Sequence, residues 1–108
     1  MNDLRQRARA IFDAGVAAAD PVQAVTRALP SLSATPDLIV SVGKAAGGMA
    51  RAALDHFADT KTIVVTNYEN ARHIDGMQVF AAGHPVPDQN GADAAKAVIA
   101  ALGVAQDH

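Results

Sequence analysis

Hydrophobic residues recur along the chain with two different spacings, and each spacing predicts one kind of secondary structure. Over residues 3–19 the apolar side chains lie three and four positions apart, which places them on one face of an amphipathic helix. They are Leu4, Ala8, Ile11, Phe12 and Val16. Residues 38–42, 62–66 and 77–82 are instead short, nearly continuous apolar runs, and the first two are rich in β-branched side chains. Such runs are typical of strands that are buried on both faces of a parallel sheet.

Signals for helices flank the predicted strands. Asp20 can cap a helix that begins at Pro21, because proline loses nothing at the first helical position, and this helix should end before Pro30. Alanine-rich patterns predict two further helices, over residues 45–57 and 91–102. The last helix is expected to turn four apolar side chains inward: Ala95, Val98, Ile99 and Leu102.

The order of these elements predicts an α/β fold. The expected architecture is a three-layer, Rossmann-like fragment in which helices flank a small, mostly parallel sheet. The connection between the second and third strands is short and polar, too short to predict a crossover helix there. The 108 residues suffice for one small domain.

The composition limits the kinds of partner and the cellular compartment that we expect for this chain. The formal net charge is −2 and no basic stripe is present, so nucleic acid is not expected as a partner. The chain has no cysteine and its histidines lack metal-ligand spacing, so no metal site is predicted. No apolar segment approaches a transmembrane length and no signal-peptide pattern is present; we therefore expect no membrane partner and a cytoplasmic location.

The junction between the first strand and the next helix is the strongest candidate for chemistry. Gly43 permits a sharp exit from the strand, and Lys44 follows at the strand's carboxyl end, where open α/β sheets bind ligands. Helix-start amide groups favour anions, and Lys44 adds a point charge that suits a carboxylate or a phosphate. The spacing of glycine and lysine matches neither a Walker phosphate loop nor a dinucleotide-binding G-x-G-x-x-G motif.

Two further loops are expected at the same edge of the sheet. Asn67 and Tyr68 follow the second strand, although ordinary turn chemistry explains them equally well. After the third strand, two prolines hold an extended loop that can present His84 and Asp88 in a fixed geometry. The alternative is that Asp88 or Asn90 simply caps the last helix.

Four segments together resemble a known family. Residues 18–21 read Ala-Ala-Asp-Pro, residues 42–46 Val-Gly-Lys-Ala-Ala, residues 64–68 Val-Val-Thr-Asn-Tyr and residues 82–88 Ala-Gly-His-Pro-Val-Pro-Asp. They resemble the amino-terminal region of the glycerate 2-kinase family that carries a carboxy-terminal MOFRL domain. Some members of that family are named hydroxypyruvate reductases. The resemblance implies that residues 1–108 form the amino-terminal part of the α/β domain, with the family's Ser-Gly-Gly-Gly-Ser phosphate segment and second domain outside them.

The resemblance also implies an activity. Family members transfer the γ-phosphoryl group of ATP, with Mg²⁺, to the 2-hydroxyl of D-glycerate, so the partner would be a small hydroxy acid. Lys44 matches the catalytic lysine of the family, and the matched substrate-binding residues are Gly43, Asn67, His84 and Asp88. Where relatives commonly carry a basic residue and a glycine after the second strand, this chain has Asn67 and Glu69. We expect the full-length kinase to be active and the isolated chain to be inactive.

Two other functions compete with the kinase. The first is an NAD(P)H-dependent hydroxypyruvate reductase, which the missing dinucleotide motif opposes. The second is a non-catalytic α/β binding or assembly module, in which the alanine-rich helices and the small sheet pack against a second copy as a homodimer.

Overall fold

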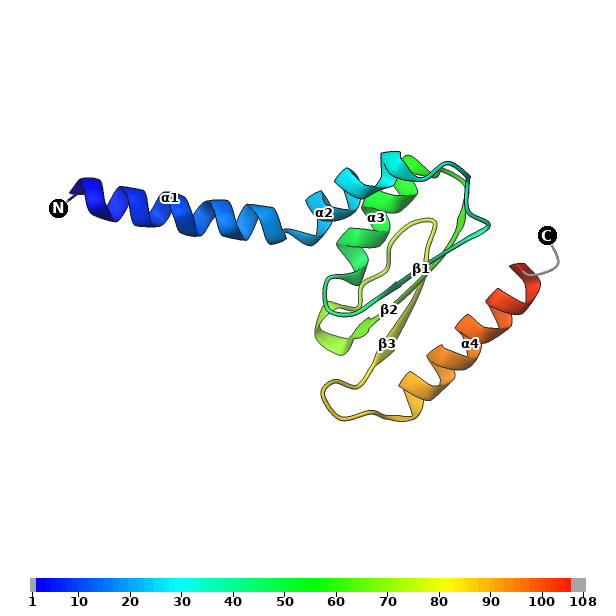
Figure 1. Ribbon diagram of the computed structural model, residues 1–108. Coiled ribbons are helices and arrows are strands. Elements are labelled where there is room, and N and C mark those ends of the chain that lie inside the picture. The colour runs from blue at the N-terminus through cyan, green and yellow to red at the C-terminus, as the bar shows by residue number, and fades with distance from the viewer. Residues whose placement is uncertain (1, 106–108) are drawn as a thin grey trace.

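The computed structural model describes residues 2–105, whose elements alternate between helices and strands (Figure 1). In chain order they are α1 (Asn2–Ala19), α2 (Pro21–Ala28), the 3-10 turn η1 (Leu29–Ser31), β1 (Leu38–Val42), α3 (Ala46–His56), β2 (Lys61–Asn67), the 3-10 turn η2 (Tyr68–Asn70), β3 (Gln78–Ala82) and α4 (Gln89–Ala105). All the predicted helices and strands are confirmed, with their ends shifted by a few residues.

The three strands form one sheet in the order β1-β2-β3, and both pairs are parallel. The register places Val42 opposite Val65 and Asn67 opposite Ala82. The three strands therefore end at the same edge of the sheet, and the predicted α/β class is confirmed. No α-helix lies between β2 and β3; η2 and the residues that follow it make this connection.

Helices cover the two faces of the sheet (Figure 1). On one face α3 packs against β1 and β2, where Ala46 and Ala50 bury against Val64. On the other face α4 packs mainly against β3, and the buried residues of this helix are Ala94 and Ala101. Because alanine is so small, each helix backbone lies close to the sheet.

The inward face predicted for the last helix is wrong for Ala95, Ile99 and Leu102, whereas Val98 is half-buried. Ala94 and Ala101 are buried, whereas Ile99 is 67% exposed and Leu102 is 47% exposed, and Ala95 is exposed as well. The reason is that alanines occur on every side of α4, so the larger aliphatic residues did not mark the packed side. Two alanines mark the side of α4 that packs on the sheet instead.

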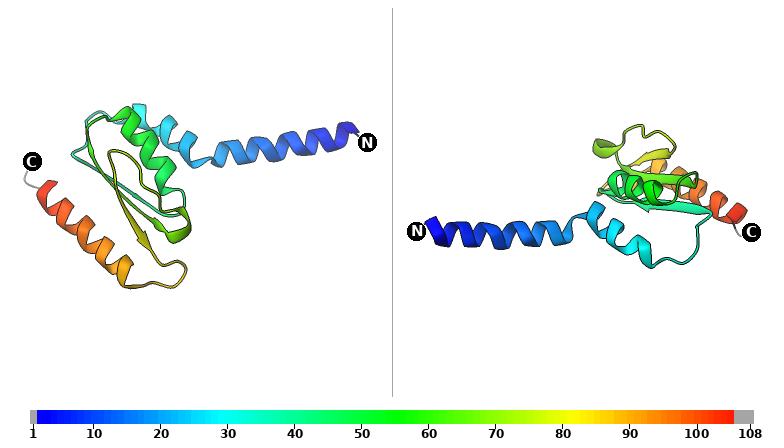
Figure 2. Two further views of the ribbon diagram at one scale, coloured as in Figure 1. Left: turned by 180° about the vertical axis from the view of Figure 1, so that it is seen from behind. Right: turned by 90° about the horizontal axis from the view of Figure 1, so that it is seen from above.

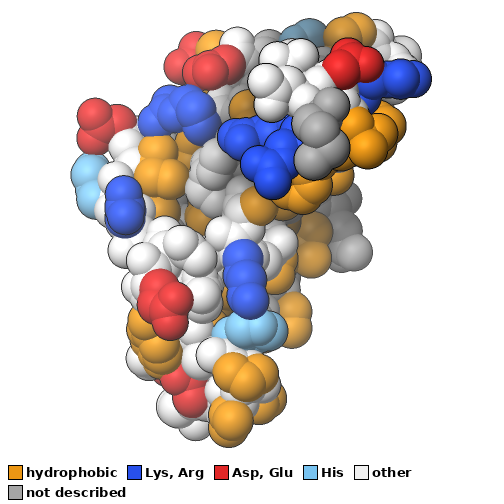
Figure 3. All heavy atoms as spheres, turned by 90° about the vertical axis from the view of Figure 1, so that its left-hand side faces the viewer, with side chains coloured by type: hydrophobic (Ala, Val, Ile, Leu, Met, Phe, Trp, Pro, Cys, Tyr) orange, Lys and Arg blue, Asp and Glu red, His pale blue; other side chains and the backbone are white. Residues whose placement is uncertain are grey.

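The first helix projects from the body as an arm (Figure 2). It ends where Asp20 caps α2, the Asp20 carboxylate accepting a hydrogen bond of 2.9 Å from the Gln23 amide. No residue of α1 is buried, and the predicted apolar face is exposed, with Ile11 75% and Phe12 67% exposed. Figure 3 views the molecule from the side of this arm, where basic and hydrophobic side chains lie next to each other.

Over residues 2–105, no helix combines the length and the apolar character needed to cross a membrane.

We predict that Ala50→Leu lowers the free energy of unfolding by about 1–3 kcal/mol, because Ala50 is 1% exposed and a larger side chain must push α3 from the sheet. Chemical denaturation followed by circular dichroism measures this. Ala95→Leu, on the exposed side of α4, is the matched control and should change stability little. Equal losses in both variants would contradict this packing.

Candidate functional site

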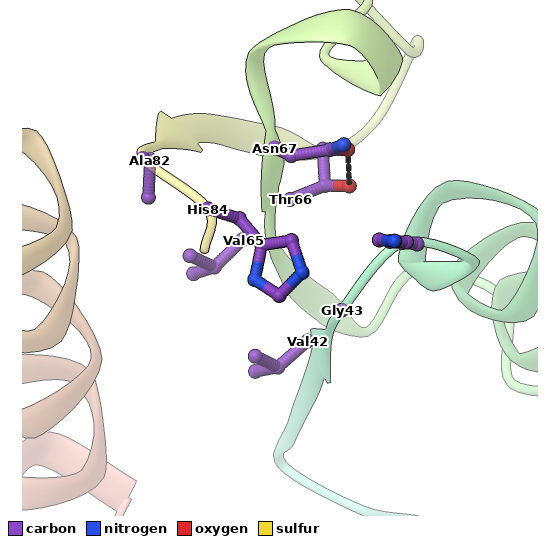
Figure 4. A pocket seen from close by; sticks show the side chains of 9 residues that line it. Val42, Gly43, Val65, Thr66, Asn67, Ala82 and His84 are labelled. Atoms are coloured by element: carbon purple, nitrogen blue, oxygen red, sulfur yellow. Dashed lines mark hydrogen bonds between the residues drawn. The ribbon is translucent and has the colours of Figure 1, made fainter. Parts of the chain in front are cut away.

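The carboxyl ends of the three strands surround one cavity of about 480 Å³ (Figure 4). Each strand contributes its last residues and the start of the loop that follows. The lining residues are Val42, Gly43, Lys44, Val65, Thr66, Asn67, Ala82, Gly83 and His84. The register pairs Val42 with Val65, so these valines share a face of the sheet and give the cavity an apolar floor.

Gly43 directs the chain from β1 into the cavity wall. Its φ of +117° lies in the region that favours glycine, and its N–H donates to the Val65 carbonyl at 3.0 Å. The Ser41 hydroxyl donates to the Ala46 carbonyl at 2.8 Å, which ties the end of β1 to the start of α3. Lys44 therefore lies between a fixed strand and a fixed helix, with its side chain exposed at the cavity.

Asn67 forms the part of the wall that β2 supplies. Its Oδ1 accepts hydrogen bonds from the Asn70 side-chain amide at 2.6 Å and from the Thr66 hydroxyl at 3.3 Å. These contacts occupy the oxygen and leave the Asn67 amide nitrogen as a donor that no described side chain engages. Figure 4 shows the Asn67 and Thr66 side chains together at the end of β2.

His84 comes from the loop after β3, and its imidazole reaches back over the strand ends (Figure 4). Asp88 closes this loop. Its Oδ1 accepts from the Gly83 N–H at 2.9 Å and from the Gly91 N–H at 3.0 Å. The second of these bonds caps α4, so the capping alternative predicted from the sequence is confirmed for Asp88.

The second oxygen of Asp88 accepts a hydrogen bond from the Tyr68 hydroxyl. Asn90 in turn donates to the Tyr68 hydroxyl oxygen at 3.0 Å. The Tyr68 hydrogen bond, followed by the Gly83 and Gly91 amides, lowers the pKa of Asp88. The same bond to Asp88 raises the pKa of Tyr68, because ionisation of the phenol would remove the donor.

The cavity offers an anion a set of hydrogen-bond donors above an apolar floor. Its polar wall carries the Lys44 ammonium group, the Asn67 amide and the His84 imidazole, and the described residues that line it include no carboxylate. This donor set suits a carboxylate or phosphate. It does not fit Mg²⁺, which prefers oxygen ligands; residues 2–105 hold no group of three His, Asp or Glu side chains suited to a metal.

Four of the five predicted site residues thus meet at one cavity: Gly43, Lys44, Asn67 and His84. Asp88 lies behind the wall, where it binds the Gly83 amide. No site role is predicted for Thr66 or Asn70, whereas for Tyr68 a site role and ordinary turn chemistry agree equally well with the sequence. The signal that could have singled out Tyr68 was its place as the sole tyrosine of the chain, directly after Asn67.

A parallel α/β sheet with a donor-lined cavity at its carboxyl edge defines the general class of ligand-binding α/β proteins. Within that class the chain belongs to the DUF4147 family, a domain of unknown function whose model matches residues 7–108.

Named relatives and solved structures extend this assignment. The chain is 42% identical to a protein of Agrobacterium vitis that is provisionally named a hydroxypyruvate reductase, over 91% of this chain and 23% of that protein. It is 39% identical to the D-glycerate 2-kinase of Thermotoga maritima, over 81% of this chain and 22% of the relative. A crystal structure of glycerate kinase from Thermotoga maritima superposes with a TM-score of 0.84 and 36% identity, over 93% of this chain and 25% of that one. The chain therefore spans about a quarter of the length of these relatives, and the predicted resemblance is confirmed.

We predict that Gly83→Ala lowers the melting temperature, because a Cβ there would lie 2.6 Å from the Val86 carbonyl oxygen and 2.9 Å from the Asp88 carboxylate. Gly103→Ala is the matched control: it lies in α4 with open space around it and should stabilise the chain by about 0.5–1 kcal/mol. Thermal melts followed by circular dichroism compare the two. A Gly83→Ala variant as stable as Gly103→Ala would show that the loop does not require the close approach of Asp88.

Proposed function

We propose that this chain supplies the lysine-bearing part of the active site of an ATP-dependent glycerate 2-kinase. The reaction transfers the γ-phosphoryl group of ATP to the 2-hydroxyl of D-glycerate. One observation carries the proposal: Lys44, Asn67 and His84 lie around the same cavity, at the edge of the sheet where α/β proteins bind ligands. The glycerate kinase names of the Thermotoga maritima relative and of the crystal structure from that organism support the choice of reaction.

The chemistry of the cavity agrees with a small hydroxy acid. Glycerate carries one carboxylate, which suits the donors Asn67 and His84, and its short carbon chain suits the apolar floor formed by Val42 and Val65. In the transfer, the 2-hydroxyl oxygen forms a bond to the γ-phosphorus, its proton is released to solvent, and the bond from that phosphorus to the bridging oxygen of ADP breaks. In that step negative charge develops on the leaving oxygen of ADP and is spread over the equatorial oxygens of the transferring group, and a lysine fixed between β1 and α3 stabilises this charge as a point charge.

The described residues include one that suits a phosphate of ATP but no group that suits Mg²⁺. Lys44 is the residue of this chain that would contact a phosphate of ATP. The described residues do not fit Mg²⁺, and we derive no step through that ion. Since the chain spans 22% of the Thermotoga maritima enzyme, we propose that residues 1–108 alone do not turn over.

The second candidate function is an NAD(P)H-dependent hydroxypyruvate reductase. The name of the Agrobacterium vitis relative favours it. The turn at Gly43 and Lys44 opposes it, because the G-x-G-x-x-G spacing that brings a helix start close to a pyrophosphate is missing.

The decisive experiment uses a chimera in which residues 2–105 replace the matching segment of the Thermotoga maritima D-glycerate 2-kinase. We expect ATP-dependent phosphorylation of D-glycerate by the chimera, and a loss of about a hundredfold or more in kcat for Lys44→Ala with the fold intact. Lys61→Ala is the matched control, because Lys61 lies at the opposite end of β2. A folded chimera that oxidises NADH or NADPH with hydroxypyruvate, and phosphorylates nothing, would establish the reductase instead. A Lys44→Ala chimera with the kcat of the parent chimera would show that Lys44 takes no part in phosphoryl transfer.

We also predict that His84→Ala raises the KM of the chimera for D-glycerate about tenfold, the effect of losing one hydrogen bond to a charged group. The melting temperature should stay within the scatter of the parent, since the His84 side chain is exposed. His73→Ala is the control: His73 pairs with Asp75 at 3.0 Å, outside the cavity wall. Steady-state kinetics with varied D-glycerate measure the change. An unaltered KM would leave His84 without a role in binding.

A further inference from the structure

The loop that carries His84 is joined to the segment after the neighbouring strand by a small hydrogen-bond network. We call Tyr68, Asp88 and Asn90 the Tyr68 network. Tyr68 belongs to η2, directly after the strand that supplies Asn67, whereas Asp88 and Asn90 lie where the β3–α4 loop enters α4. The network therefore links two segments that leave neighbouring strands, and it does so without lining the cavity itself.

The Tyr68 hydroxyl and both Asp88 oxygens are engaged in hydrogen bonds. The Tyr68 hydroxyl donates to one Asp88 oxygen and accepts from the Asn90 amide at 3.0 Å. The other Asp88 oxygen accepts from the Gly83 amide at 2.9 Å and the Gly91 amide at 3.0 Å. Gly83 directly precedes His84, so the position of Asp88 sets where the His84 backbone begins.

The packing around Gly83 makes this link stiff. A side chain at Gly83 would overlap both the Val86 carbonyl and the Asp88 carboxylate, so loop and carboxylate are already in close contact. Movement of Asp88 therefore carries the loop with it. Tyr68 is the group that connects this carboxylate to η2, and thereby to the end of β2.

We propose that Tyr68, Asp88 and Asn90 are positioning residues that fix His84 over the cavity. They act through His84 and touch no substrate. The part of this inference that concerns substrate rests on the proposed function, whereas the part that concerns the His84 loop does not.

A spectroscopic titration tests the network in the 108-residue chain. Tyr68 is the sole tyrosine and tryptophan is absent, so the absorbance of the tyrosinate ion reports on this residue alone. We expect an apparent pKa above the ordinary value of 10.0 in the parent, and a value closer to 10.0 in Asp88→Asn. Asp93→Asn is the matched control, because Asp93 bonds to Gln89 on α4 and should leave the titration unchanged. An Asp88→Asn titration identical to the parent would overturn the network.

Nuclear magnetic resonance of the same chain tests whether the network positions His84. The His84 ring signal is the one missing from the spectrum of His84→Ala. We expect Tyr68→Phe, which removes a single hydroxyl group, to shift and broaden this signal and to leave that of His73 in place. A His84 signal that does not respond would overturn the positioning role.

A double-mutant cycle in the chimera separates positioning from general stability. We expect Tyr68→Phe to raise the KM for D-glycerate about tenfold when His84 is present, and to add nothing in the His84→Ala background. Equal increases in both backgrounds would show that Tyr68 does not act through His84 and would overturn the proposal. A chimera without kinase activity would refute the proposed function alone, and the two spectroscopic measurements would still decide the positioning role.

Discussion

The parallel pairing of β1, β2 and β3 is the constraint on which the rest of this structure depends. Parallel strands end at the same edge, and the register decides which side chains meet there. Val42 lies opposite Val65, Asn67 lies opposite Ala82, and the ladder continues by one bond from the Gly43 amide to the Val65 carbonyl. A shift of one residue would turn the valines from the cavity toward the opposite face of the sheet and remove its apolar floor.

Small residues at the start of α3 allow this helix to begin close to the carboxyl edge of the sheet, and this places Lys44 at the cavity. Ala46 and Ala50 are almost fully buried against the sheet, so only three residues need to separate the end of β1 from the start of α3. Ser41 secures the junction through its bond to the Ala46 carbonyl. A lysine placed in so short a connection has little freedom of backbone movement. The position of Lys44 is thus a consequence of how closely α3 approaches β1.

Much of this arrangement could be predicted because its causes are local. Short apolar runs marked the strands, and the glycine and proline signals marked where the chain turns at their ends. The buried face of α4 could not be predicted, because alanine occurs on all sides of that helix and the burial of Ala94 and Ala101 depends on how the helix packs on the sheet. The bond between Tyr68 and Asp88 joins residues 20 positions apart and depends on the shape of η2, which no local pattern encodes.

The case of Asp88 shows why two interpretations of one residue need not compete. A carboxylate has four acceptor positions, and Asp88 uses one oxygen for two amides and the other for a phenol. The amide of Gly91 belongs to the first turn of α4, whereas that of Gly83 belongs to the loop of His84. One set of hydrogen bonds to Asp88 therefore both caps the helix and shapes the cavity. Because these bonds engage both Asp88 oxygens behind the wall, Lys44, Asn67 and His84 define the polar character of the cavity.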